Sequence, residues 1–227
     1  MRYSCWLGFL LVPLLAGCAR FPSTTTASDT PPVTLVSDIT VRGAINGNYY
    51  YFLALNNDTD PTHGPVPVKT VQALGNYWGV IAGYGPNDPV VQPSYYVEYF
   101  NGNFEQYLNG QPIGPPYAGR VSTDGKSLHV EIDARAITAT GVLPGFVELN
   151  WITTDTITPR PESVGLQKNY DGFGPTGDQF LSYVPLSTNN TWQSGVNGVI
   201  DELPNDDNNA TIPDIDMTAW RVEVRLK

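Results

Sequence analysis

Frequent turn signals without any helical periodicity are the feature that most constrains this chain. From Val33 onward no stretch keeps apolar residues at the 3.6-residue spacing of a helix, whereas Gly, Pro and Asn-Gly signals recur about every 10 to 15 residues. Short strands between closely spaced turns are typical of β-sandwiches and barrels. We therefore predict an all-β fold, an antiparallel β-sandwich of two packed sheets with long loops and little helix, forming one domain over residues 33–227.

Three dipeptides predict hairpins within this domain: Asn46-Gly47, Asn101-Gly102 and Asp124-Gly125. Such pairs favour the two positive φ angles of a type I′ turn. Apolar and polar residues alternate in 127–133 and again in 220–226, which predicts two half-buried strands. The sequence predicts long loops at 56–68, 109–120, 154–179 and 201–216.

The amino terminus has the features of a secretion signal. Arg2 precedes an apolar run that is too short to span a membrane as a mature helix, and small residues lead to a cysteine in Leu15-Ala16-Gly17-Cys18. This motif resembles the lipobox of bacterial lipoproteins, which implies that residues 1–17 are removed and that Cys18 is lipidated. The alternative is an ordinary signal peptide that is cut elsewhere, with Cys18 incidental.

The residues after Cys18 bear on the final location. In bacterial lipoproteins, an aspartate directly after the lipidated cysteine retains the protein in the inner membrane. Here Ala19 and Arg20 follow Cys18, so the resemblance implies sorting to the outer membrane more than retention in the inner one. Residues 18–32 are rich in Ser, Thr and Pro, which predicts a flexible tether between the lipid and the domain. We therefore expect an exported protein of the bacterial cell envelope that is attached to the membrane through an N-terminal lipid anchor.

Charge and motif content exclude several functions. The chain has 12 Lys and Arg against 22 Asp and Glu, a formal net charge of −10, so nucleic acid is not an expected partner. The segment 120–127 contains the GKS of a phosphate-binding loop, but Arg120 stands where the first glycine must be. No nucleophile elbow, zinc helix or dinucleotide fingerprint occurs, and no spacing marks His63, His129 or Met217 as haem ligands. A catalytic triad could still assemble in space.

The stretch NNDTDPTHGP, residues 56–65, follows an apolar run and offers a candidate metal site. It is not an EF-hand, because position six from Asp58 is His63 and position twelve is Lys69. Asp58 and Asp60 could still direct two carboxylates at one Ca²⁺ ion, with Asn side chains and loop carbonyls as further oxygen ligands. The alternative is a turn held by Asx hydrogen bonds and the fixed φ of proline.

The hairpin expected at 95–108 offers a candidate ligand site. A two-residue turn at Asn101-Gly102 would place Glu98 opposite Glu105 and Tyr96 opposite Tyr107. One hairpin face would then be apolar and the other would carry Tyr96, Glu98, Phe100, Glu105 and Tyr107. Two carboxylates directly opposite each other repel, which suggests a ligand. A cation from a neighbouring strand, or a bulge that shifts the register, would also explain the pair.

The order of these features resembles a known group of sandwich proteins. The aromatic strand that leads into D-x-D-P-x-x-G-P, the strand pair YVEYFNGNFE and the later strand FVELNW are similar to bacterial lipoproteins built like family 9 carbohydrate-binding modules and DOMON domains. The resemblance implies the sandwich and a non-catalytic binding module with a carbohydrate-like ligand. The alternative is a structural or assembly lipoprotein that contacts another envelope protein, and a hydrolase is the third possibility.

Overall fold

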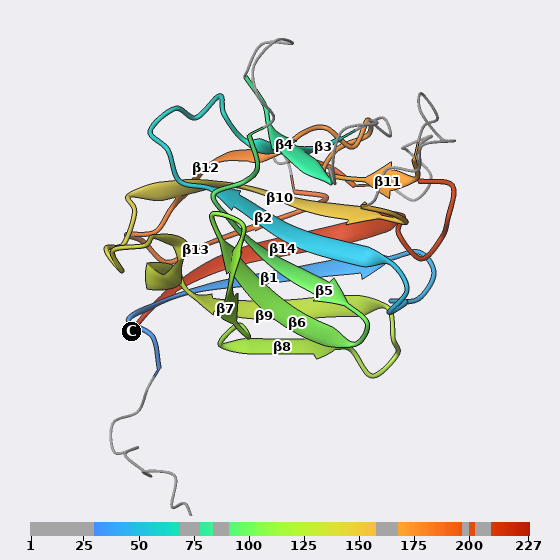
Figure 1. The fold of residues 1–227 in the computed structure, drawn as a ribbon, viewed down its shortest axis with the longest axis horizontal. Helices are drawn as coiled ribbons and strands as arrows, with labels where there is room; N and C mark the ends of the chain where they lie inside the picture. Colours follow the sequence, from blue (N-terminus) through green and yellow to red (C-terminus); the bar gives the residue numbers. More distant parts are fainter. Residues whose placement is uncertain (1–29, 69–77, 84–90, 158–167, 197–199, 203–209) are drawn as a thin grey trace, which may run out of the picture. The chain divides into compact units, whose positions relative to one another are not determined.

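Two antiparallel sheets pack against each other in the computed structural model, which confirms the predicted all-β sandwich (Figure 1). The structure describes residues 30–68, 78–83, 91–157, 168–196, 200–202 and 210–227. The chain divides into Met1–Thr30 and a compact unit, Pro31–Lys227, that contains all the strands the structure describes. Cys18 and the predicted signal peptide and most of the tether lie outside the described residues.

The first sheet joins the two ends of the domain. Its order is β13-β14-β1-β9-β8, with bounds Asn190–Gln193, Met217–Leu226, Val33–Val41, Ser127–Asp133 and Ala118–Val121. The predicted alternation is confirmed in β9, where Leu128, Val130 and Ile132 are fully buried. In β14 the alternation holds through Val224, whereas Leu226 at the strand end is 37% exposed.

The second sheet carries the candidate sites. Its order is β11-β10-β2-β5-β6-β7, with β12 also paired to β10; the bounds are Tyr170–Asp171, Phe146–Thr154, Tyr50–Asn56, Tyr95–Phe100, Asn103–Leu108, Gln111–Gly114 and, for β12, Leu181–Pro185. A separate ribbon pairs β3 (Pro65–Pro67) with β4 (Gly79–Ile81). The described helical structure is one 3₁₀ turn, Ala134–Ile137.

The inner faces of the two sheets form the main core. Leu35 and Ile39 of β1 are packed together with Leu53 of β2 and Trp151 of β10. The indole N–H of Trp151 donates to the Ser37 hydroxyl at 2.7 Å and so links the two sheets. Burying such side chains between two layers supplies the main driving force for the sandwich.

The β3–β4 ribbon covers part of the outer face of the second sheet (Figure 1). The Asn150 amide of β10 donates to the Pro65 carbonyl at 3.1 Å, and the Trp78 ring stacks on Phe52 with centroids 3.9 Å apart. Strand β10 is therefore buried on both faces, which explains why nearly all of its residues are buried.

The turns confirm part of the hairpin prediction and correct the rest. Asn101 and Gly102 have φ angles of 50° and 78°, as a type I′ turn requires, and they join β5 to β6. The prediction for Asn46-Gly47 is wrong, because β1 and β2 belong to different sheets and this segment crosses between them. At Asp124-Gly125 the hairpin β8–β9 forms, but only Gly125 has a positive φ.

The predicted long loop at 109–120 is also wrong. Asn109 and Gly110, with φ angles of 50° and 74°, form a second turn with two positive φ angles that joins β6 to β7, and β8 begins at Ala118. Two of the other predicted loops contain short pieces of strand, β3 in 56–68 and β11 in 154–179. Residues 158–167 and 203–209 of these loops lie outside the described part of the chain.

Candidate functional site

The outer face of the second sheet is built by alternate residues of β2, β5 and β6. The predicted register is confirmed: Tyr96 pairs with Tyr107 and Glu98 pairs with Glu105. On the other side of β5, Phe52 of β2 lies opposite Glu98. We call the following residues the aromatic–acidic face: Tyr50, Phe52, Tyr96, Glu98, Phe100, Glu105 and Tyr107.

Neither a shift in register nor a neighbouring cation explains why the carboxylates of Glu98 and Glu105 face each other. The register between β5 and β6 is continuous, so no bulge separates Glu98 from Glu105. Glu105 accepts a hydrogen bond from the Gly114 amide at 2.8 Å, but within the described residues neither glutamate forms an ion pair with Lys or Arg. Burial, and then the charge of Glu105, raises the pKa of Glu98 above its usual range. Repulsion between the two carboxylates therefore remains in the free protein.

Aromatic rings flank the carboxylates on both sides. Tyr107 stacks on Tyr96 with centroids 4.6 Å apart, and Phe100 stacks on Tyr50 at 4.2 Å. Tyr50, Phe100 and Tyr107 are half-buried, so part of each ring remains accessible. Tyr50 was not predicted as a site residue, because the hairpin register alone does not show which strand lies beside β5.

Tyr96, a predicted residue of the ligand site, does not present an exposed ring. Tyr96 is only 7% exposed and belongs to a second, smaller core with Phe52, Ala54, Trp78 and Ile152. Trp78, which directly precedes β4, lies edge-on to Tyr96 with centroids 4.8 Å apart. Tyr96 therefore supports the half-buried Tyr107 from beneath and is not itself available to a ligand.

The Asp58–Asp60 loop has the hydrogen bonds of the predicted turn. One oxygen of Asp58, Oδ1, accepts from the Asp60 amide at 2.7 Å, and Oδ1 of Asp60 accepts from the Thr62 amide at 3.0 Å and from its hydroxyl at 2.7 Å. The hydrogen bonds from Thr62 lower the pKa of Asp60, and the nearby His63 acts in the same direction.

His63 lies between the two aspartates, although it was not predicted as part of this site. Its Nδ1 is 3.1 Å from Oδ2 of Asp58, and its Nε2 is 3.4 Å from Oδ2 of Asp60. Among the described residues, no three His, Cys, Asp or Glu side chains lie close enough together to hold a metal ion as they stand.

A third acidic group is buried beside this loop. Glu148 of β10 pairs with Asn56, the last residue of β2, and is fully buried. Both of its carboxyl oxygens lack a hydrogen-bond partner. Burial, together with the charges of Asp58 and Asp60, raises the pKa of Glu148 to about 7. The sequence did not single out Glu148, because the strand pairing that brings it to the loop is not visible in the local pattern.

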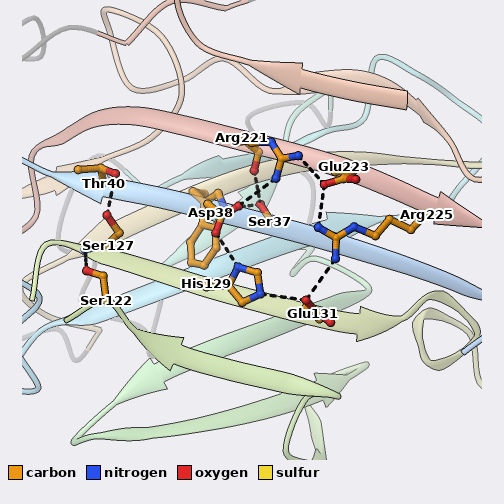
Figure 2. A network of polar contacts seen from close by, with 11 residues as sticks. Ser37, Asp38, Thr40, Ser122, Ser127, His129, Glu131, Arg221, Glu223 and Arg225 are labelled. Carbon is orange, nitrogen blue, oxygen red and sulfur yellow. Dashed lines mark hydrogen bonds and ion pairs between the residues drawn. The ribbon is translucent and has the colours of Figure 1, made fainter. Parts of the chain in front are cut away.

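The first sheet carries a contrasting polar network (Figure 2). Asp38 contacts His129 at 2.7 Å and Arg221 at 3.7 Å, and His129 reaches Glu131 at 3.1 Å. Arg225 contacts Glu131 at 3.4 Å and Glu223 at 2.9 Å, and Arg221 closes the ring with Glu223 at 2.5 Å. Each acidic side chain here has a basic or histidine partner, so this network stabilises the β9-β1-β14 pairing and leaves no carboxylate that requires a ligand.

A cavity of about 260 Å³ lies beside the polar network. Asp38 and Arg221 line it, together with Gln193 and Ser194 at the end of β13. Because Asp38 and Arg221 already pair with each other, and because the Ser194 hydroxyl accepts from the Trp220 amide at 3.1 Å, its polar groups are mostly occupied. The aromatic–acidic face is therefore the stronger candidate for a ligand.

Comparisons with protein-family models, with curated proteins and with solved structures find no match. The resemblance to family 9 carbohydrate-binding modules and DOMON domains thus stays a prediction. In the part of the chain that the structure describes, no helix has the length and apolar character needed to cross a membrane.

Proposed function

We propose that this protein is a lipid-anchored, non-catalytic binding module of the bacterial cell envelope, held through Cys18, whose carbohydrate-like ligand lies on the aromatic–acidic face. The observation that carries the proposal is the Glu98–Glu105 pair, which no described cation neutralises and which accessible rings flank on two sides. Sugar hydroxyls are donors that two adjacent carboxylates accept. Sugar rings also present C–H faces that pack against the faces of aromatic side chains.

Screening the full chain against a broad set of soluble glycans, followed by calorimetry on any ligand found, tests this proposal. Phe100→Ala combined with Tyr107→Ala should weaken binding by about fivefold or more, because each ring contact contributes about 0.5–1.5 kcal/mol. Tyr183→Ala is the matched control, since Tyr183 lies on β12 and is 57% exposed. Absence of any glycan binding, or equal affinity of the double variant and the parent, would contradict the proposal.

Glu98→Gln should separate stability from binding. Removing one of two facing charges should raise the free energy of unfolding of the free protein by about 0.2–1 kcal/mol, while a ligand that uses the carboxylate is bound more weakly. Urea denaturation and calorimetry measure the two effects. Glu131→Gln is the control, because Glu131 contacts Arg225 and His129 and its loss should not stabilise the protein. A destabilised Glu98→Gln protein would show that the pair is not repulsive.

A further inference from the structure

The buried carboxyl group of Glu148 requires a physical explanation. A fully buried carboxyl group with no hydrogen-bond partner on either oxygen is unfavourable, and such groups commonly indicate an ion or water that completes the site. Strand pairing places Glu148 opposite Asn56, the residue at which the acidic loop begins. Paired residues of neighbouring strands lie on the same face of a sheet, and the Asn56 amide donates to the His63 carbonyl at 2.8 Å, so Glu148 lies beside the loop that carries Asp58 and Asp60.

The hydrogen bonds from the Asp60 amide and from Thr62 use one carboxylate oxygen of each aspartate. The Oδ1 atoms of Asp58 and Asp60 accept the turn hydrogen bonds, whereas both Oδ2 atoms face the His63 ring. The turn therefore fixes the two aspartates and leaves one oxygen of each for a cation. A turn and a metal site, which the sequence leaves as alternatives, are compatible in this geometry.

The His63 ring occupies the place where a cation would lie. It bridges the two Oδ2 atoms and can supply at most one positive charge against three carboxyl groups. Because the side chains do not converge at ligand distances as they stand, a metal ion would have to displace this ring. His63 is half-buried and belongs to a loop, so such a displacement does not require the sheet to change.

We propose that Asp58, Asp60 and Glu148 form a divalent-cation site that takes Ca²⁺ and displaces His63 from the two aspartates. All three side chains offer hard oxygen ligands, which Ca²⁺ prefers. The other histidine, His129, is held by Asp38 and Glu131 in the polar network, so a site built on several histidines, as Zn²⁺ favours, is not available here. The site is independent of the proposed glycan function.

Calorimetry of the full chain, freed of metal with a chelator and titrated with CaCl₂, tests the site. We expect one bound Ca²⁺ per chain and a higher melting temperature in Ca²⁺ than in chelator, because the ion binds the folded state. Asp58→Asn and Glu148→Gln should each weaken Ca²⁺ binding at least about tenfold. Glu148→Gln is nearly isosteric and cannot ionise, so this variant should fold.

Asp124→Asn is the matched control. Asp124 also holds a turn, accepting from the Ser122 hydroxyl and from the Lys126 amide at 3.1 Å, but it has no buried carboxyl group among its contacts. The Asp124→Asn variant should bind Ca²⁺ with the same affinity as the parent protein.

Histidine ring resonances provide a second readout, since the chain has 2 histidines. Addition of Ca²⁺ should shift the ring signals of His63 and leave those of His129 unchanged. Absence of Ca²⁺ binding, equal Ca²⁺ affinity in Glu148→Gln and parent, or binding of Zn²⁺ without Ca²⁺ would overturn the proposal.

Discussion

Replacing Trp151 by alanine should lower the free energy of unfolding by about 3–5 kcal/mol, the usual loss for a large aromatic side chain in a core. Trp151 is 1% exposed and lies between the two sheets, where its indole N–H donates to the Ser37 hydroxyl of β1. The alanine variant would leave a cavity at the centre of the sandwich and would remove the hydrogen bond between the sheets, although the Ser37 hydroxyl would still donate to the Arg221 carbonyl. Chemical denaturation followed by far-ultraviolet circular dichroism measures the effect without depending on tryptophan fluorescence.

Trp192→Ala is the control for this experiment. Trp192 lies on the short edge strand β13 and is only half-buried, so its loss should cost clearly less than the loss of Trp151. Equal losses in the two variants would show that Trp151 does not hold the sheets together.

Glu148 should make the metal-free protein less stable as the pH rises. Its pKa is raised from 4.5 to about 7 by burial and by the charges of Asp58 and Asp60. The folded chain therefore binds more protons than the unfolded chain between these values, and the free energy of unfolding falls as the pH rises through this range. At about 1.4 kcal/mol per pKa unit, the fall is at most about 3 kcal/mol, and solvent screening reduces it. Glu148→Gln cannot ionise and should lose this contribution to the pH dependence.

Urea denaturation in chelator at about pH 5 and about pH 8 measures this difference. Glu223→Gln is the control, because the pKa of Glu223 is shifted in the opposite direction to that of Glu148. Hydrogen bonds from Arg225 and Arg221 hold the pKa of Glu223 below its usual range. The contribution of Glu223 is present above the unfolded pKa and is lost as the pH falls, so it does not change between pH 5 and 8. Identical pH profiles for the parent and Glu148→Gln would show that Glu148 is not buried as a neutral acid.

The aromatic–acidic face and the proposed cation site of Asp58, Asp60 and Glu148 share one physical feature. In the second sheet Glu98, Glu105 and Glu148 have no basic partner among the described residues, whereas the first sheet pairs its acidic groups in the polar network. Unpaired carboxylates cost stability, and proteins retain such costs mainly where a ligand or ion offsets them. The difference between the two sheets supports binding at the second one.

The sequence was sufficient where a local rule decides the structure. The type I′ turn at Asn101-Gly102 depends on the φ angles of two residues, and it fixed the register that places Glu98 opposite Glu105. The alternation in β9 likewise predicted which side chains are buried. The same rule would have located the turn at Asn109-Gly110, so the missed strand β7 was within reach of the sequence.

Only the tertiary structure decided which strands and loops lie together. Asn46-Gly47 has the composition of a hairpin turn, yet β1 pairs with β9 and β14 and β2 pairs with β5 and β10, so the segment between them crosses the sandwich. Trp78 covers Tyr96, and Glu148 pairs with Asn56 at the start of the Asp58–Asp60 loop, so both contacts join segments far apart in the chain. Turn geometry is set by the dihedral preferences of adjacent residues, whereas sheet membership is set by the apolar surface that distant strands bury together.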